Sequence, residues 1–133
     1  MIPVHAQRLL LLSLLLLAMS GCSLPDSGGA SEVHVTLTEF TIEASSRIFA
    51  PGVPYHLVVT NRGKVNHELR IGPPGVQGGL EEIAWMDEMT LQPGTVHTID
   101  VTFPQSARGT DFEFACHLPA HYEFGMHLAV TMR

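Results

Sequence analysis

The sequence predicts an all-β fold, namely a Greek-key β-sandwich with one short helical segment. Two observations carry this prediction. Apolar and polar residues alternate with a period of two through several short segments, which is the pattern of strands that bury one face. Turns rich in glycine and proline separate these segments, and nothing shows the long rhythm of strand, helix and strand that a parallel sheet requires. Two packed sheets are therefore the natural architecture.

The strands follow from this alternation in chain order. In the first segment, Val33, Val35 and Leu37 share one face and polar residues occupy the other. A β-branched run then lies between two turns, one around Pro51-Gly52 and one at Asn61-Arg62-Gly63. The predicted strands, part of a set of about seven, cover Val33–Ile42, Tyr55–Thr60, Val65–Ile71, Thr95–Phe103, Thr110–Ala115 and Met126–Met132.

One segment departs from the alternation, and its pattern predicts the short helical segment. Within Gly79–Met89, Leu80, Ile83 and Ala84 recur at the spacing of one helix face. The acidic residues here are interpreted as a solvated face, with a docking patch for a basic redox partner as the alternative. These acidic residues are Glu81, Glu82, Asp87 and Glu88.

Residues 1–21 have the pattern of a secretory leader. Arg8 precedes an apolar run that is too short to span a bilayer, and small residues stand before Cys22. Cys22 after Ser20-Gly21 resembles the lipobox of bacterial lipoproteins, which implies that Cys22 is lipidated and begins the mature chain. Ordinary secretion is the alternative. Residues 22–31 then form a flexible tether, and residues 32–133 form the sandwich domain.

Size, charge and cysteine content limit the function. Removing residues 1–21 from a chain of 133 leaves 112, which suffices for one domain with one core. The leader holds one arginine and no acidic residue, so its removal changes the formal charge from −6 to −7. No basic patch for nucleic acid is present. With only two cysteines, we expect no disulfide framework.

A short C-terminal stretch carries the chemistry. Cys116, His121 and Met126 follow one another with four residues between each pair. A thiolate and a thioether are soft ligands and an imidazole is borderline, so the set suits copper, and a blue-copper site needs one further histidine. His67 is the best candidate, on a predicted neighbouring strand. Zinc also accepts imidazole and thiolate and stays the alternative metal.

Residues 112–130 resemble the ligand loop of the cupredoxin family, and residues 60–63 and 66–72 resemble its upstream loop and first-histidine strand. The resemblance implies the cupredoxin form of the sandwich and one type 1 copper ion. Azurins and plastocyanins usually follow the upstream histidine with an asparagine that ties the two ligand loops together, whereas this chain has Glu68. It also has Ala120 where glycine is common. The implied copper ligands are His67, Cys116, His121 and Met126.

The other histidines of the domain are predicted to stay outside the site. His117 adjoins Cys116 and His127 adjoins Met126, so in extended backbone their side chains point to the opposite face. Structural or solvent roles are expected for His34, His56 and His97, which lie in alternating segments without a second donor nearby.

Two functions fit these features of the sequence. The first is the transfer of single electrons between extracytoplasmic redox proteins by a copper protein, held at a membrane by its lipid. The second is a copper chaperone or storage protein that delivers the ion to another protein. We expect a monomer and no enzymatic activity, since no nucleophile and base of the Ser-His-Asp kind is recognisable.

Overall fold

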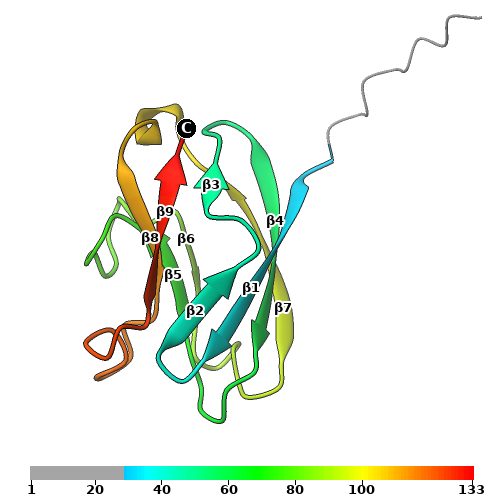
Figure 1. The fold of residues 1–133 in the computed structure, drawn as a ribbon, viewed down its shortest axis with the longest axis vertical. Coiled ribbons are helices and arrows are strands. Elements are labelled where there is room, and N and C mark those ends of the chain that lie inside the picture. Colours follow the sequence, from blue (N-terminus) through cyan, green and yellow to red (C-terminus); the bar gives the residue numbers. More distant parts are fainter. Residues whose placement is uncertain (1–28) are drawn as a thin grey trace, which may run out of the picture.

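The computed structural model describes residues 29–133, which form two β-sheets packed face to face (Figure 1). The predicted signal peptide, the lipidation site at Cys22 and most of the predicted tether lie outside these residues. Strand β1 begins at Ser31, the last residue of that tether. No helix in the described part is long and apolar enough to cross a membrane.

The two sheets together hold all nine strands of residues 29–133. Most neighbouring strands are antiparallel, but β1 is parallel to β4 and β3 is parallel to β9. The first sheet has the order β2-β1-β4-β7, with β1 at Ser31–Thr38, β2 at Thr41–Ala44, β4 at Pro54–Asn61 and β7 at Val96–Thr102. The second has the order β3-β9-β8-β5-β6, with β3 at Ile48–Phe49, β5 at Leu69–Gly72, β6 at Ala84–Met86, β8 at Asp111–Ala115 and β9 at His127–Met132.

The core lies between the sheets and is built from the alternation seen in the sequence. Val35 on β1 and Leu57 on β4 are fully buried from the first sheet. Phe49 packs against Phe103 and Phe114 with ring centroids 5.0 and 5.7 Å apart. Each such side chain stabilises the fold by about 1.5–3 kcal/mol on burial. The predicted β-sandwich is confirmed, with the strand β3 as an addition that the sequence did not indicate.

The predicted strand Val33–Ile42 is two strands. A tight turn at Glu39-Phe40 separates β1 from β2, and Phe40 has a left-handed backbone with φ of 61°. The hydroxyl groups of Thr38 and Thr41 hydrogen-bond at 2.6 Å across this turn. Alternation did not reveal the turn because Ile42 is again buried on β2. The prediction of one continuous strand was therefore wrong.

The predicted strand Val65–Ile71 is also shorter than expected. Pairing begins only at Leu69, so His67 lies in a loop before β5 and not on a strand. The His67 N–H donates to the carbonyl of Leu91 at 3.1 Å, and the Val65 carbonyl accepts from the side chain of Asn61. These bonds to other parts of the chain replace a strand ladder.

The predicted helical segment within Gly79–Met89 is wrong. Residues Ala84–Met86 form β6, which pairs with β5 at the sheet edge, and the Ile83 N–H donates to the Ile71 carbonyl at 2.8 Å. Gly78 and Gly79 have positive φ, which a helix does not accommodate. Pairing with the open edge of β5 therefore prevails over a weak helical pattern. The one helix in residues 29–133 is a 3-10 turn, η1, at Gln105–Ala107.

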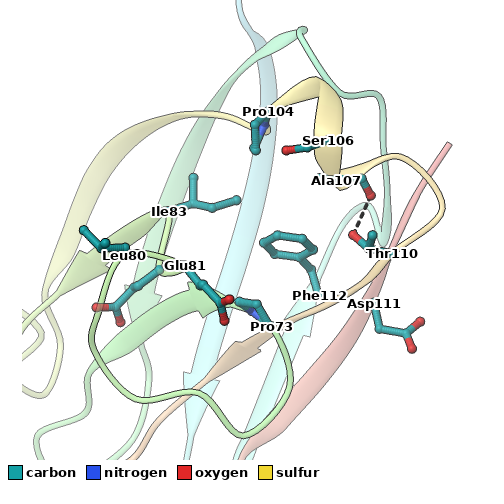
Figure 2. Close-up of a pocket in the computed structure, with 11 residues that line it drawn as sticks. Pro73, Leu80, Glu81, Ile83, Pro104, Ser106, Ala107, Thr110, Asp111 and Phe112 are labelled. Atoms are coloured by element: carbon teal, nitrogen blue, oxygen red, sulfur yellow. Dashed lines mark hydrogen bonds between the residues drawn. The ribbon is translucent and has the colours of Figure 1, made fainter.

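A pocket of about 650 Å³ lies beside η1 (Figure 2). Pro104 and Ala107 line it from one side, Pro73 and Ile83 from another, and Phe112 forms its base. None of the predicted copper ligands lines it. The loop over 62–68 and the loop over 116–126 both lie at the other end of the sandwich, away from η1 (Figure 1).

Candidate metal centre

Three of the four predicted ligands lie together at that end of the sandwich. The Nδ1 atoms of His67 and His121 are 3.3 Å apart, and the Cys116 sulfur is 3.4 Å from Nδ1 of His121. One ligand atom from each of the three side chains lies within 4.8 Å of the other two. His67 and Cys116 are fully buried, whereas His121 is half-buried. Within residues 29–133 no other such group of histidine, cysteine or acidic side chains occurs.

Met126, the fourth predicted ligand, is fully buried and closes the same loop. Its N–H donates to the His121 carbonyl at 3.0 Å, and its carbonyl accepts from the Cys116 N–H at 3.0 Å. Because the backbone of Met126 is bonded to both other ligand residues of the loop, the three are fixed relative to one another. The regular spacing in the sequence thus corresponds to one compact turn between β8 and β9.

Local turns hold the rest of this loop. The N–H of Phe124 donates to the Ala120 carbonyl at 3.1 Å, and that of His121 donates to the Leu118 carbonyl at 2.9 Å. Ala120 has φ of 70°, in the left-handed region where a Cβ costs about 1–2 kcal/mol. This explains why glycine is common at the corresponding position of the resembling loops. The loop tolerates alanine at that cost.

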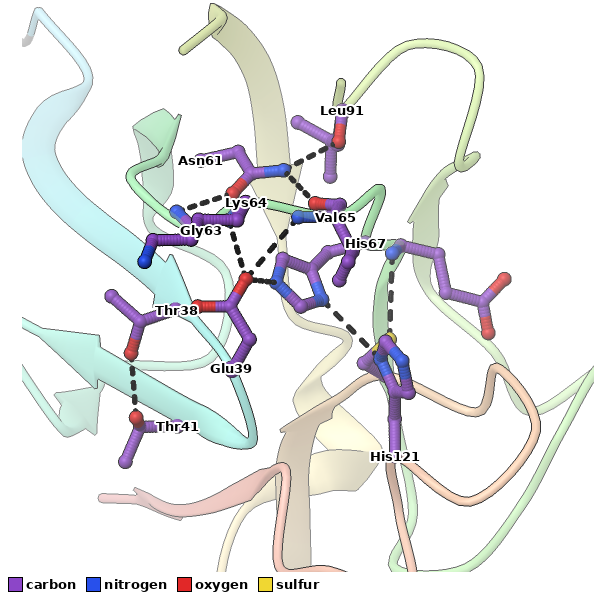
Figure 3. A network of polar contacts seen from close by, with 12 residues as sticks. Thr38, Glu39, Thr41, Asn61, Gly63, Lys64, Val65, His67, Leu91 and His121 are labelled. Carbon is purple, nitrogen blue, oxygen red and sulfur yellow. Dashed lines mark hydrogen bonds and ion pairs between the residues drawn. The ribbon is translucent and has the colours of Figure 1, made fainter. Parts of the chain in front are cut away.

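The segment that carries His67 is held by a buried asparagine (Figure 3). Asn61 is fully buried, and its side-chain amide donates to the carbonyls of Val65 and Leu91 at 2.9 and 2.8 Å. Its carbonyl oxygen accepts from the Gly63 N–H at 2.8 Å. The Leu91 carbonyl also accepts from the N–H of His67, so Asn61 and His67 share one anchor.

Glu39, in the turn between β1 and β2, reaches the other side of this segment (Figure 3). Its carboxylate accepts from the N–H groups of Lys64 and Val65, and one oxygen lies 3.9 Å from Nε2 of His67. The hydrogen bond from Lys64 is the main cause that lowers the pKa of Glu39. A Cβ on Gly63 would lie 2.6 Å from the same oxygen and 2.8 Å from Nε2 of His67, so only glycine fits there.

The electrostatics of the cluster favour a bound cation. Burial, followed by the charge of His121, lowers the pKa of His67, which favours the neutral ring that can donate a lone pair to an ion. Burial raises the pKa of the Cys116 thiol, although N–H groups of Glu68 and Leu118 oppose this effect. A buried thiolate therefore needs a positive partner. Nδ1 of His67 faces Nδ1 of His121, whereas its Nε2 faces Glu39, so Nδ1 is the nitrogen available to an ion. These donors fit a soft or borderline metal ion.

The remaining histidines of residues 29–133 lie outside the donor cluster, as the sequence predicted. His117 stacks on Tyr122 with ring centroids 4.4 Å apart, and Tyr122 stacks on His127 at 4.7 Å. On the exposed face of the first sheet, His56 of β4 contacts the carboxylate of Asp100 on the neighbouring strand β7 at 2.6 Å.

Sequence reasoning missed the residues that hold the upstream segment. The sequence indicated Asn61 only as part of a turn, and Glu39 only as part of a strand. The Asn-Arg-Gly sequence at 61–63 contained a usable signal for the first, because asparagine side chains often cap such turns. No signal identified Glu39, which lies far from His67 in the sequence.

Comparison of the fold with solved structures finds auracyanins and an azurin. An auracyanin from Roseiflexus castenholzii is 24% identical and superposes with a TM-score of 0.60, over 79% of this chain and 99% of that one. Auracyanin A from Chloroflexus aurantiacus is 15% identical, with a TM-score of 0.59 over 79% and 100% of the two chains. An azurin from Methylomonas sp. strain J is 15% identical, with a TM-score of 0.53 over 79% and 99%. No family model and no curated protein sequence matches the chain.

These likenesses define the class of structure. The chain has the cupredoxin fold, as the resemblance of its ligand loop implied. Within that fold, the two histidines and the cysteine form a donor cluster of the type 1 kind. Met126 is fully buried, and its backbone is hydrogen-bonded to Cys116 and His121.

Proposed function

We propose that this chain binds one copper ion through its four predicted ligands and carries single electrons between redox proteins outside the cytoplasm. The observation that carries the proposal is the cluster of two imidazoles and one thiol. Their ligand atoms lie within 4.8 Å of one another, and two of the three side chains are buried. One structural neighbour is described as a "blue" copper protein, which supports the same assignment. The ligands are His67, Cys116, His121 and Met126.

Copper would supply a one-electron couple, and the residues of the chain would limit structural change between its two oxidation states. Asn61 holds the Val65 carbonyl, and the Leu91 carbonyl accepts from the N–H of His67, so the backbone that leads into His67 is fixed. The Cys116 N–H is bonded to the Met126 carbonyl, which fixes the other side. Because these bonds are made by the chain alone, the donors are arranged before the ion arrives. Small rearrangement favours fast electron exchange.

His121 is the proposed point of electron exchange, because it alone among the three clustered donors reaches the surface. The ring of Phe40 meets it edge-on at 5.3 Å, and Phe124 lies 4.9 Å from Phe40. Phe40 and Phe124 are 37% and 65% exposed, so they form an apolar rim beside the ligand. A redox partner that covers this rim would exclude water from the gap between the two proteins.

Copper delivery is the second candidate function. The half-exposed loop that carries His121 favours exchange of the ion with another protein, whereas the buried His67 and Cys116 favour retention. We expect the copper-loaded protein to show an intense thiolate band near about 600 nm and to lose copper to a chelator only slowly. Rapid loss would support delivery, and a protein that takes up zinc but no copper would overturn both assignments.

We also propose that Cys22 carries a lipid that anchors the domain at a membrane, because the Ser-Gly-Cys sequence follows a short apolar run. One acyl chain binds a bilayer only marginally, so the several chains of a bacterial lipoprotein would be needed. We expect the protein expressed with its own leader to fractionate with membranes, and Cys22→Ser to impair its processing or release it. An unmodified Cys22 in the mass spectrum would remove the anchor and leave the metal centre unaffected.

A further inference from the structure

Each predicted ligand in the loop over 116–126 is followed directly by a residue with a ring, and these three rings lie against one another. In chain order, the pairs of ligand and ring are Cys116-His117, His121-Tyr122 and Met126-His127. The ring of Tyr122 stacks on that of His117, with centroids 4.4 Å apart and planes inclined by 11°. It also stacks on that of His127, at 4.7 Å and 25°. We call the rings of His117, Tyr122 and His127 the ring stack. It joins the start and the middle of the loop to the first residue of β9.

The ring stack and the ligand side chains lie on opposite sides of the backbone. Cys116 and Met126 are fully buried, whereas the residues after them, His117 and His127, are half-buried and exposed. This alternation is expected at the end of β8 and the start of β9, because neighbouring side chains of extended backbone point to opposite faces. Contact between the rings therefore limits where the backbone places the ligands, without any contact to the ion itself.

A buried carboxylate on β8 lies against the ring stack. Glu113 exposes only 5% of its side chain, although both of its neighbours on the strand are core residues and its own side chain points to the outer face. Its Oε1 accepts from the Gly75 N–H at 2.9 Å, and its Oε2 lies 3.6 Å from Nδ1 of His127. A Cβ on Gly75 would lie 3.9 Å from the hydroxyl of Tyr122, so the tyrosine reaches the same place. The ring stack therefore packs on the outer face of the second sheet.

We propose that Tyr122 is a positioning residue of the metal centre, whose ring holds the ligand loop against the sheet through His117 and His127. Backbone hydrogen bonds, such as that from the Met126 N–H to the His121 carbonyl, fix the turns within the loop. The ring stack fixes those turns relative to β8 and β9. The inference rests on the proposed copper-binding function, but the ring stack is made by the chain alone and is measurable without copper.

Two substitutions separate the ring of Tyr122 from its hydroxyl. Tyr122→Ala removes both stacked pairs, whereas Tyr122→Phe keeps the ring and removes only the hydroxyl. Glu123→Ala shortens the next side chain of the same loop, which is exposed, and serves as the matched control. Hydrogen exchange of the Met126 amide is measured in the purified metal-free protein. The EPR spectrum and the rate of copper loss to a chelator are measured in the loaded protein.

We expect Tyr122→Ala to speed exchange of the Met126 amide about tenfold, which corresponds to two aromatic pairs of ordinary strength. Copper loss should be about tenfold faster, as for other groups that orient a ligand. The EPR spectrum should broaden, because the ligands are no longer held in one arrangement. Tyr122→Phe should behave as the wild type, and so should Glu123→Ala. His127→Ala removes one stacked pair and keeps the other, so it should speed exchange only about threefold and leave the spectrum intact.

Unchanged amide exchange in Tyr122→Ala would overturn the hold on the loop. Faster exchange with unchanged EPR and copper loss would make the ring stack a stabilising contact alone and would overturn the positioning role. If Tyr122→Ala fails to fold, Tyr122→Leu takes its place, since it keeps apolar volume without a flat ring. A wild-type protein that binds no copper would overturn the proposed function, while the exchange measurement would still decide whether the ring stack holds the loop.

Discussion

The two segments that supply the donors are held in different ways. The upstream segment, residues 62–68, is fixed mainly by side chains outside it, namely Asn61 directly before it and Glu39 from the turn between β1 and β2. The downstream loop, residues 116–126, is fixed mostly by bonds within its own backbone. The first presents the fully buried His67, and the second presents the half-exposed His121.

This difference shows how one site combines retention with access. A segment held by side chains outside it cannot move without disturbing the rest of the sandwich. The position of its histidine, His67, is therefore fixed. The downstream loop is held by its own backbone hydrogen bonds, so it keeps its geometry although His121 is half-exposed. The two segments are joined at Glu68, whose carboxylate accepts from the N–H of His117. Substitutions on each side test whether these roles are distinct.

The largest effect is expected from Cys116→Ser, which removes the thiol of the donor cluster. Without a thiolate, the band near about 600 nm should disappear, because that absorption arises from charge transfer between thiolate and copper. Visible and EPR spectra measure the change. His127→Ala removes an imidazole outside the cluster and should leave the spectrum intact. A Cys116→Ser protein with the wild-type spectrum would refute the assignment of the downstream loop.

Asn61→Ala should destabilise the metal-free protein by about 3 kcal/mol, since the three hydrogen bonds of this fully buried side chain, worth about 1 kcal/mol each, are lost. The upstream segment should loosen before the rest of the sandwich does. Chemical denaturation gives the free energy of unfolding, and hydrogen exchange of the His67 amide locates the effect. Asn66→Ala, at a half-buried position in the same loop, is the matched control. Equal and small effects of both substitutions would contradict the role of Asn61.

Gly63→Ala tests whether the position of His67 is fixed, without deleting a hydrogen-bonding side chain. The added Cβ would stand 2.8 Å from Nε2 of His67 and 2.6 Å from Glu39, so the ring or the carboxylate must move. We expect copper affinity to fall about tenfold, by analogy with the loss of a group that orients a ligand. Gly29→Ala has open space around its Cβ and should have no effect. Unchanged affinity in Gly63→Ala would mean that the upstream segment is less rigid than its contacts indicate.

Met126→Leu should have a smaller effect, because an axial thioether is a weak ligand. Leucine keeps the volume of the buried side chain, so the loop should stay closed and the colour should persist. The reduction potential should rise, since a donor to the oxidised ion is lost. Voltammetry of the variant and the wild type measures the shift. Complete loss of copper would instead make Met126 a primary ligand.

The smallest effect is expected from Ala120→Gly in the downstream loop. Glycine relieves a left-handed conformation that costs alanine about 1–2 kcal/mol, but it also gives the unfolded chain more freedom, worth about 0.4–1 kcal/mol. A net gain in stability between about 0 and 1.6 kcal/mol is expected on those figures, with an unchanged spectrum. Thermal unfolding with and without copper measures it. A clear loss of stability would show that the loop does not hold the conformation described.

The sequence alone predicted the donor cluster and the class of fold. Cys116, His121 and Met126 are separated by few residues, so backbone geometry over one loop nearly decides where their side chains meet. Burial of one sheet face likewise leaves a period-two pattern that can be read directly. The core strand β4 followed from this pattern, whereas His67 was chosen correctly as a donor but lies in a loop and not on the predicted strand.

Only the tertiary structure decided how the donors are held. Glu39 lies against His67 and Glu68 reaches His117 because the sandwich brings distant turns to one end, and such contacts leave no periodic pattern in the chain. The open edge of β5 likewise converted the predicted helix near Ala84 into strand β6. Local spacing is fixed by a few bonds of backbone, whereas these contacts depend on the packing of the whole domain.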